Sequence, residues 1–191
     1  VLALSQPALV YKDYLLIYYA GHGYKVNNKA YWVGVNNSSK NKYHKMVNVN
    51  ELTNTLENIK ARHIFFMIDS CYAGISFNSK SSNIEDVDNS INAINKSLIS
   101  YSRKVLTSGH NQKVIDTYFE NDHSLFAEGF LKILKENNSS FTAETLYVKI
   151  KQLHQMDESL EQIPKYGPIS NLKLTMKDIA VGDFVFHVPN N

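Results

Sequence analysis

The chain has 191 residues, of which 43% are hydrophobic and 20% are charged, and its formal net charge is +2. This length and composition predict one globular domain that is large enough to bury a core. The charges are nearly balanced and scattered, and only Arg62 and Arg103 are arginines, so we expect no nucleic-acid partner. No apolar run approaches the ~20 residues that a membrane helix needs, so we expect no membrane contact.

The chain contains one cysteine, Cys71, and therefore cannot form an internal disulfide. Lone thiols are typical of reducing compartments, so we expect a cytoplasmic protein. No signal peptide is recognisable. The chain begins at Val1 rather than at a methionine, which indicates a fragment or a processed piece of a longer protein.

Four runs of aromatic, leucine-rich or β-branched residues predict strands. They are residues 14–20, 63–69, 102–108 and 183–188. The first two are apolar on both faces, as is typical of buried central strands in a parallel sheet. Between them, residues 24–35 predict a hairpin that turns at Asn27 and Asn28, because asparagine tolerates a positive φ.

Helical spacing of apolar residues appears in four further segments. They are residues 50–59, 91 to about 101, 122 or 123 to about 136, and 142 to about 155, with Asn50 and Ser90 as candidate caps. Strands that alternate with helices predict an α/β domain with a mainly parallel central sheet. Residues 163–171 hold two prolines and are predicted to be irregular, and residues 77–90, rich in Ser, Asn and Asp, are predicted to form an exposed loop.

Two of the predicted strands run into small-residue turns that carry a reactive side chain. The turns read GHG (21–23) and SCYAG (70–74). Because ligands bind beyond the carboxyl ends of parallel strands, we expect His22 to act as base or acid beside a Cys71 nucleophile. Backbone N–H groups of Gly23 and Cys71 would then face the oxyanion. The alternative is a buried, inert thiol and a histidine that only forms a turn.

These residues resemble the signature segments of the caspase-like cysteine peptidases. The segments YYAGHG (18–23) and IDSCYAG (68–74) are most similar to metacaspases and prokaryotic caspase homologues, in which an Asp precedes the Cys by two positions. Animal caspases have Gln-Ala-Cys there. His22 and Cys71 are 49 positions apart, close to the roughly 50 found in caspases. The resemblance runs from about residue 12 to the C-terminus.

The resemblance implies the caspase–hemoglobinase fold, a His22–Cys71 dyad, protein or peptide substrates, and no metal or other cofactor. Family members carry a strand, a helix and a second strand before the His strand, whereas only 13 residues precede Tyr14. We therefore expect residues 1–191 to be a partial domain, completed by the N-terminal part of the same fold or by a regulatory domain or subunit. Some members act in programmed cell death or, in prokaryotes, in antiphage defence.

The resemblance also implies that Asp69 lines the primary specificity pocket and pairs with a substrate Lys or Arg. A carboxylate suits such a cation physically. Ser108 and Asp116, near the next strand end, are further candidate lining residues. The alternatives are that Asp69 caps a turn and that the other two are solvated loop residues.

Three further questions stay open at this point. A catalytically silent scaffold that binds partners, or a hydrolase of small amides, would share these motifs. The acidic residues Glu85, Asp86 and Asp88 lack the spacing of an EF-hand calcium loop and suit a solvated loop better. The 77–90 loop contains Lys80, so it is either a self-cleavage site or an uncut surface loop.

Overall fold

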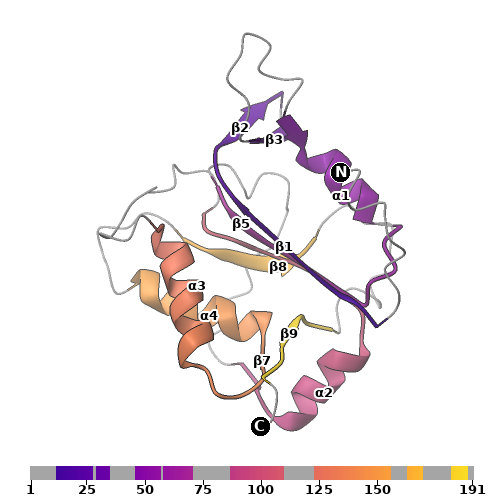
Figure 1. The fold of residues 1–191 in the computed structure, drawn as a ribbon, viewed down its shortest axis with the longest axis vertical. Helices are drawn as coiled ribbons and strands as arrows, with labels where there is room; N and C mark the ends of the chain where they lie inside the picture. Colours follow the sequence, from indigo (N-terminus) through magenta and orange to yellow (C-terminus); the bar gives the residue numbers. More distant parts are fainter. Residues whose placement is uncertain are drawn as a thin grey trace.

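The computed structural model describes residues 12–27, 29–34, 46–56, 58–70, 87–109, 123–155, 163–169 and 182–188. Cys71, Asp116 and residues 77–86 lie outside these ranges. The described chain forms a four-stranded sheet with four helices, which confirms the predicted α/β class (Figure 1). The strand order is β1 (Tyr14–Ala20), β5 (His63–Asp69), β6 (Ser102–Thr107) and β8 (Lys165–Pro168).

The three strands that lead to the predicted site are parallel and in register. Tyr14 pairs with His63 and Ala20 with Asp69, so β1 and β5 begin and end at the same level. Ile68 pairs with Thr107 on β6. The chain therefore leaves all three strands on the same side of the sheet. This side, formed by the carboxyl ends of the strands, is called the carboxyl edge below, and the opposite side is called the amino edge.

A smaller antiparallel sheet follows β1. It consists of β2 (Gly23–Val26), β3 (Lys29–Val33) and β4 (Met46–Asn48). The β2–β3 pair confirms the predicted hairpin, and Asn27 has the expected positive φ of 48°. Helix α1 (Val49–Leu56) begins two residues earlier than a cap at Asn50 implies, because Asn48 caps it instead: the Asn48 side-chain oxygen accepts the Asn50 N–H at 3.1 Å.

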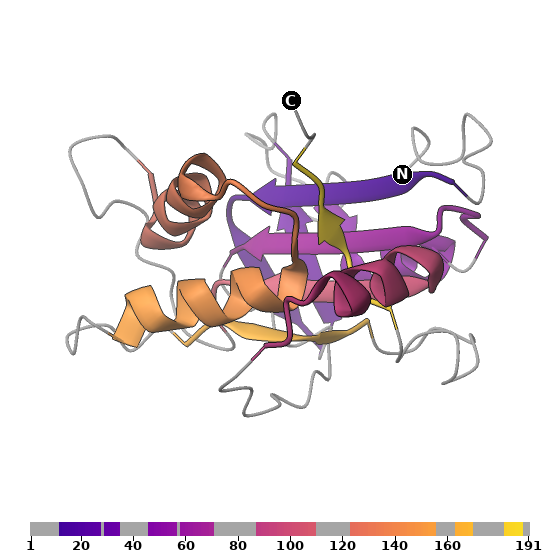
Figure 2. The ribbon, with the colours of Figure 1, turned by 90° about the horizontal axis from the view of Figure 1, so that it is seen from below.

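The other three helices lie on the opposite face of the main sheet from α1 (Figure 2). They are α2 (Ile91–Ile99), α3 (Leu125–Glu136) and α4 (Ala143–Gln155). Ser90 and Ser124 cap α2 and α3 by accepting the N–H groups of Ala93 and Ala127. The predicted segments thus form helices with boundaries shifted by a few residues.

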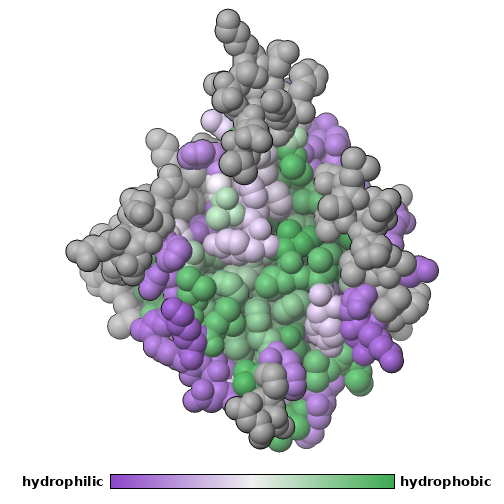
Figure 3. All heavy atoms as spheres, in the orientation of Figure 1, coloured by the Kyte–Doolittle hydropathy of each residue, from purple (hydrophilic) through white to green (hydrophobic). Residues whose placement is uncertain are grey.

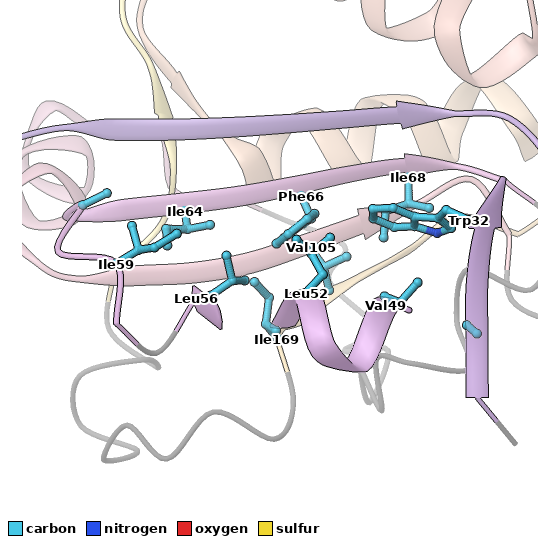
Figure 4. Packing of buried hydrophobic residues seen from close by; sticks show 12 residues of the cluster. Trp32, Val49, Leu52, Leu56, Ile59, Ile64, Phe66, Ile68, Val105 and Ile169 are labelled. Carbon is cyan, nitrogen blue, oxygen red and sulfur yellow. The ribbon is translucent and has the colours of Figure 1, made fainter. Parts of the chain in front are cut away.

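Strand β5 is the centre of two hydrophobic cores. All seven of its residues are buried, as the sequence predicts. Ile64, Phe66 and Ile68 pack toward α1, whose Leu52 and Leu56 point at the sheet (Figure 4). On the other face, the core combines β5 and β6 with α3 and α4; its β5 members are Phe65 and Met67. A strand buried on both faces needs this double cover.

Strand β1 is not the buried central strand that its sequence predicts. Leu15, Ile17 and Tyr19 pack against the α1 core, whereas Tyr14, Leu16 and Tyr18 are 40–42% exposed. Among the described residues, β1 has a paired neighbour only in β5. Figure 3 shows hydrophobic residues gathered in the middle of the face on which β1 lies. Within the described part of the chain, the outer face of β1 is only partly covered, by ring contacts such as that of Tyr18 with Phe130, and its outer edge has no paired strand. For these reasons the prediction fails.

Two predictions for the C-terminal part are also wrong. Residues 165–168 are not irregular, since they form β8 antiparallel to β6. Pro168 is tolerated because β8 is an edge strand among the described residues. Of residues 183–188, only Val185–Phe186 forms a strand, β9, which pairs with β7 (Phe141–Thr142) outside the main sheet.

Two buried basic side chains, Arg103 and His63, lie at the amino edge of the sheet. The Arg103 guanidinium donates to four backbone carbonyls, those of Ile59, Ala61, Arg62 and Ser102. His63 is fully buried, and its Nε2 donates to the Ser100 carbonyl at 2.9 Å. Burial lowers the pKa of His63 to about 4, so this imidazole is neutral in the folded protein at neutral pH.

We expect His63 to make the fold sensitive to acid. Its pKa of about 4 lies below the usual ~6.5 of an unfolded histidine, so the unfolded chain takes up the proton first as the pH falls. The stability due to neutral His63 is fully present above pH 6.5 and is lost toward pH 4, by up to about 3 kcal/mol. In His63→Gln, the free energy of unfolding in urea should therefore fall less across this range.

His123→Gln is the matched control, because His123 is exposed. It should keep the wild-type pH dependence. Buried His154, whose pKa burial also lowers, should retain part of the acid sensitivity in both variants. If His63→Gln lost stability between pH 6.5 and 4 as steeply as wild type, the assignment to His63 would be wrong.

Candidate active site

The turn that carries His22 extends the pairing of β1 with β5 by one residue. The Gly21 N–H donates to the Asp69 carbonyl at 3.2 Å. Gly21 has a φ of +156°, and a Cβ built there would lie 2.9 Å from the Tyr19 hydroxyl oxygen. Only glycine fits both the conformation and the space. His22 follows at once and is exposed at the carboxyl edge of the sheet.

The backbone of His22 is held from two sides. Its carbonyl accepts the Val33 N–H at 3.1 Å and the Tyr19 hydroxyl at 2.8 Å. The bond from Val33 makes the next pair, Gly23 and Trp32, the non-hydrogen-bonded pair of the β2–β3 ladder. The Gly23 N–H is therefore not directed at β3, which leaves it able to serve a ligand.

Asp69 ends β5 and is only 6% exposed. One of its carboxylate oxygens, Oδ2, accepts the Ser124 hydroxyl, and the same Ser124 oxygen accepts the Ala127 N–H at 3.0 Å. Asp69 thus ties the end of β5 to the first turn of α3. Burial, with the nearby Asp69 charge, raises the pKa of Tyr18, so this phenol stays neutral beside the carboxylate.

Ser108 lies at the same edge, directly after β6. It is fully buried, and its N–H donates to the Ile68 carbonyl at 2.9 Å. Its hydroxyl has no hydrogen-bond partner among the residues that the structure describes. The structure therefore brings His22, Gly23, Asp69 and Ser108 to one edge of the sheet. Cys71 and Asp116 lie outside the described residues.

Two side chains near Asp69 are missed by the sequence patterns. One is Ser124, which the predicted helix start at 122 or 123 places inside the helix, whereas in the structure it caps α3. The other is His154 on α4, which is buried and donates from Nδ1 to the Ile150 carbonyl at 2.9 Å. Burial lowers the pKa of His154, and the Asp69 charge opposes this. No spacing rule connects residues so distant in the chain.

The described residues contain no group of three or more His, Cys, Asp or Glu side chains that could hold a metal ion. Of the acidic residues in the predicted loop, Asp88 is described, and its carboxylate accepts the Ser90 N–H at 2.8 Å. This is a local turn contact on an exposed residue. Glu85 and Asp86 lie outside the described residues. None of the described helices is long and apolar enough to cross a membrane.

Comparison with known proteins agrees with this architecture. The sequence matches the family model of the caspase domain, a peptidase family, over residues 4–174. A search of curated proteins finds no match. The matched range covers most of the chain, and the parallel β1–β5–β6 sheet with helices on both faces is consistent with the caspase fold. The chain therefore belongs to the caspase domain family of peptidases.

Proposed function

We propose that this caspase-family domain is a cysteine endopeptidase with a His22–Cys71 dyad. The observation that carries the proposal is the register of β1 and β5. Ala20 pairs with Asp69, and His22 and Cys71 each come two residues after this pair. Two segments that follow adjacent parallel strands, and that begin at the same level, begin next to each other. A thiol and an imidazole at these positions suit nucleophilic catalysis.

In the proposed reaction, the Cys71 thiolate attacks the carbonyl carbon of the scissile peptide bond. The backbone N–H groups of Gly23 and Cys71 stabilise the oxyanion. The His22 imidazolium gives its proton to the leaving amine, which departs and leaves a thioester on Cys71. Neutral His22 then takes a proton from water, whose oxygen attacks the thioester and releases the acid. A reducing compartment such as the cytoplasm keeps the thiol available for this step.

Cys71→Ala and His22→Ala should each abolish peptide cleavage, and the double variant should be no worse than either single one, because the two residues act as a unit. Initial rates on peptide substrates measure this, and circular dichroism checks that each variant folds. Residual activity above a few per cent in Cys71→Ala would exclude Cys71 as the nucleophile. Iodoacetamide labelling is a second readout: Cys71 should react fast near neutral pH in wild type and slowly in His22→Ala, whereas a silent scaffold would react slowly in both.

We further propose that the enzyme cleaves after Lys or Arg and that Asp69 recognises this residue, as the resemblance to metacaspases suggests. Two observations support a basic-specific site. A buried carboxylate lies at the edge that carries His22, and Arg103 is committed to four carbonyls at the other end of the sheet. Ser108 is proposed to line the pocket beside Asp69, with Asp116 as a further candidate.

Asp69→Asn should lower kcat/KM for Lys or Arg substrates by about two to three orders of magnitude, because a substrate cation would be buried without its counter-charge. Hydrolysis after an uncharged residue should change far less. Ser124→Ala is the matched control: it removes the hydroxyl partner and one helix cap, at about 1 kcal/mol of stability, but keeps the carboxylate. Its preference for Lys or Arg should persist.

Peptide libraries with every residue at the cleavage position give the decisive comparison. Cleavage by wild type after Asp would rule out Asp69 as the specificity carboxylate. An equal loss of all substrates in Asp69→Asn would show that Asp69 only holds the end of β5 against α3.

We also propose that a further strand pairs with the open edge of β1. The N-terminal part of the same fold, or a regulatory domain or subunit, would supply it. Support comes from the row of half-exposed large side chains on β1 beside an edge that has no paired strand among the described residues. Such an edge is a template for pairing with another chain.

In the isolated chain this edge should cause self-association, and Leu16→Lys should reduce it because a charge disfavours strand pairing. Light scattering at increasing protein concentration measures the effect. Leu134→Lys on α3 is the control, since Leu134 is 38% exposed and Leu16 is 40% exposed. The edge proposal fails if both lysine variants lower the scattering equally, or if wild type is monomeric throughout.

A further inference from the structure

We propose that Tyr19 is the positioning residue of His22, and this inference rests on the proposed role of His22 in catalysis. Tyr19 lies on β1 three residues before the histidine. Its hydroxyl donates to the His22 carbonyl at 2.8 Å and accepts the Val33 N–H at 3.0 Å. The Val33 carbonyl lies 3.2 Å from the same oxygen. One hydroxyl therefore joins the end of β1, the histidine turn and the end of β3.

The ring of Tyr19 is held in place by Trp32. The two rings are stacked, with centroids 4.4 Å apart and planes 8° from parallel. Trp32 is itself buried in the α1 core. Burial also raises the pKa of Tyr19, partly opposed by its hydrogen bond with Val33. The phenol therefore remains protonated and keeps its donor at neutral pH.

Gly21 shows how closely the turn is built around this hydroxyl. The tyrosine oxygen lies where a Cβ at residue 21 would come within 2.9 Å. Tyr19, Gly21 and His22 thus form one unit, in which the glycine lets the chain pass over the hydroxyl and the hydroxyl holds the next carbonyl. The close contact between the Tyr19 hydroxyl and the turn therefore explains both the tyrosine at position 19 and the glycine at position 21.

The need for such a contact follows from where the sheet ends. Among the described residues, the bond from the Gly21 N–H to the Asp69 carbonyl is the last that ties this segment to the end of β5. Beyond it, the described bonds to the His22 carbonyl come from Tyr19 and Val33. Without the phenol, one of the two is lost and the imidazole can shift. Misplacement of a reacting group by ~1 Å costs about 100-fold in rate.

Tyr19→Phe tests the inference in the full chain, because it keeps the ring on Trp32 and removes only the hydroxyl. We expect kcat to fall by about 10- to 100-fold with KM changed less than about twofold. The pH profile of Cys71 alkylation by iodoacetamide should shift upward, toward the ~8.5 of an ordinary thiol, because the displaced imidazole pairs less well with the thiolate. Tyr14→Phe is the control: its hydroxyl lies 3.5 Å from the Leu98 carbonyl at the other end of β1, and both readouts should match wild type.

The outcomes separate this inference from the dyad proposal. If His22→Ala is inactive while Tyr19→Phe matches wild type in kcat and alkylation profile, only the role of Tyr19 is overturned. If His22→Ala is active, the dyad proposal itself fails. A rise in KM at unchanged kcat in Tyr19→Phe would also overturn a positioning role.

Should Tyr19→Phe fail to fold, a fluorinated tyrosine at position 19 keeps the shape and lowers the pH at which the hydroxyl loses its proton. Activity should then decline as the pH rises through that ionisation, because the donor to the His22 carbonyl disappears. An unchanged alkaline limb would overturn the inference.

Discussion

The level register of β1 and β5 is the constraint on which the candidate site depends. Parallel pairing from Tyr14 with His63 to Ala20 with Asp69 brings two segments 49 positions apart in the sequence to one sheet edge. The Gly21 N–H, bonded to the Asp69 carbonyl, carries the alignment one step past the strands. A slip of one residue would turn every β1 side chain to the other face. The packing of Leu15, Ile17 and Tyr19 against the α1 core opposes such a slip, since it would turn these three side chains away from that core.

The two edges of the sheet are built for different purposes. At the amino edge, the buried Arg103 guanidinium donates to the carbonyls of Ala61 and Arg62, just before β5, and His63 is buried in its neutral form. These backbone carbonyls are thus satisfied within the fold, without reference to any ligand. The carboxyl edge differs, because its histidine, His22, is exposed. That contrast is what a scaffold with one functional edge requires.

Asp69 combines a structural contact with the proposed specificity role. Its bond from Ser124 joins β5 to the first turn of α3, and the Ser124 oxygen in turn caps that helix. The helix thereby holds the carboxylate from one side, while Tyr18 and His154 lie within reach of its charge. A carboxylate that is fixed before the substrate arrives needs little reorganisation on binding, which favours recognition of a cation.

The sequence alone predicts what local chemistry dictates: the all-apolar strand at 63–69, the hairpin at Asn27, the helices and the order of the His and Cys turns. The sequence also predicts that the candidate residues lie at one edge of the sheet, because a strand is expected to end where an apolar run meets small residues. Only the tertiary structure decides that β1 is an edge strand among the described residues, that Lys165–Pro168 pairs with β6, and that Ser124 reaches Asp69 from 55 positions away. The same holds for Tyr19, whose partner is the carbonyl of His22. Cover by other elements and bonds to backbone atoms depend on where the chain returns in space, and no periodicity in the sequence records that.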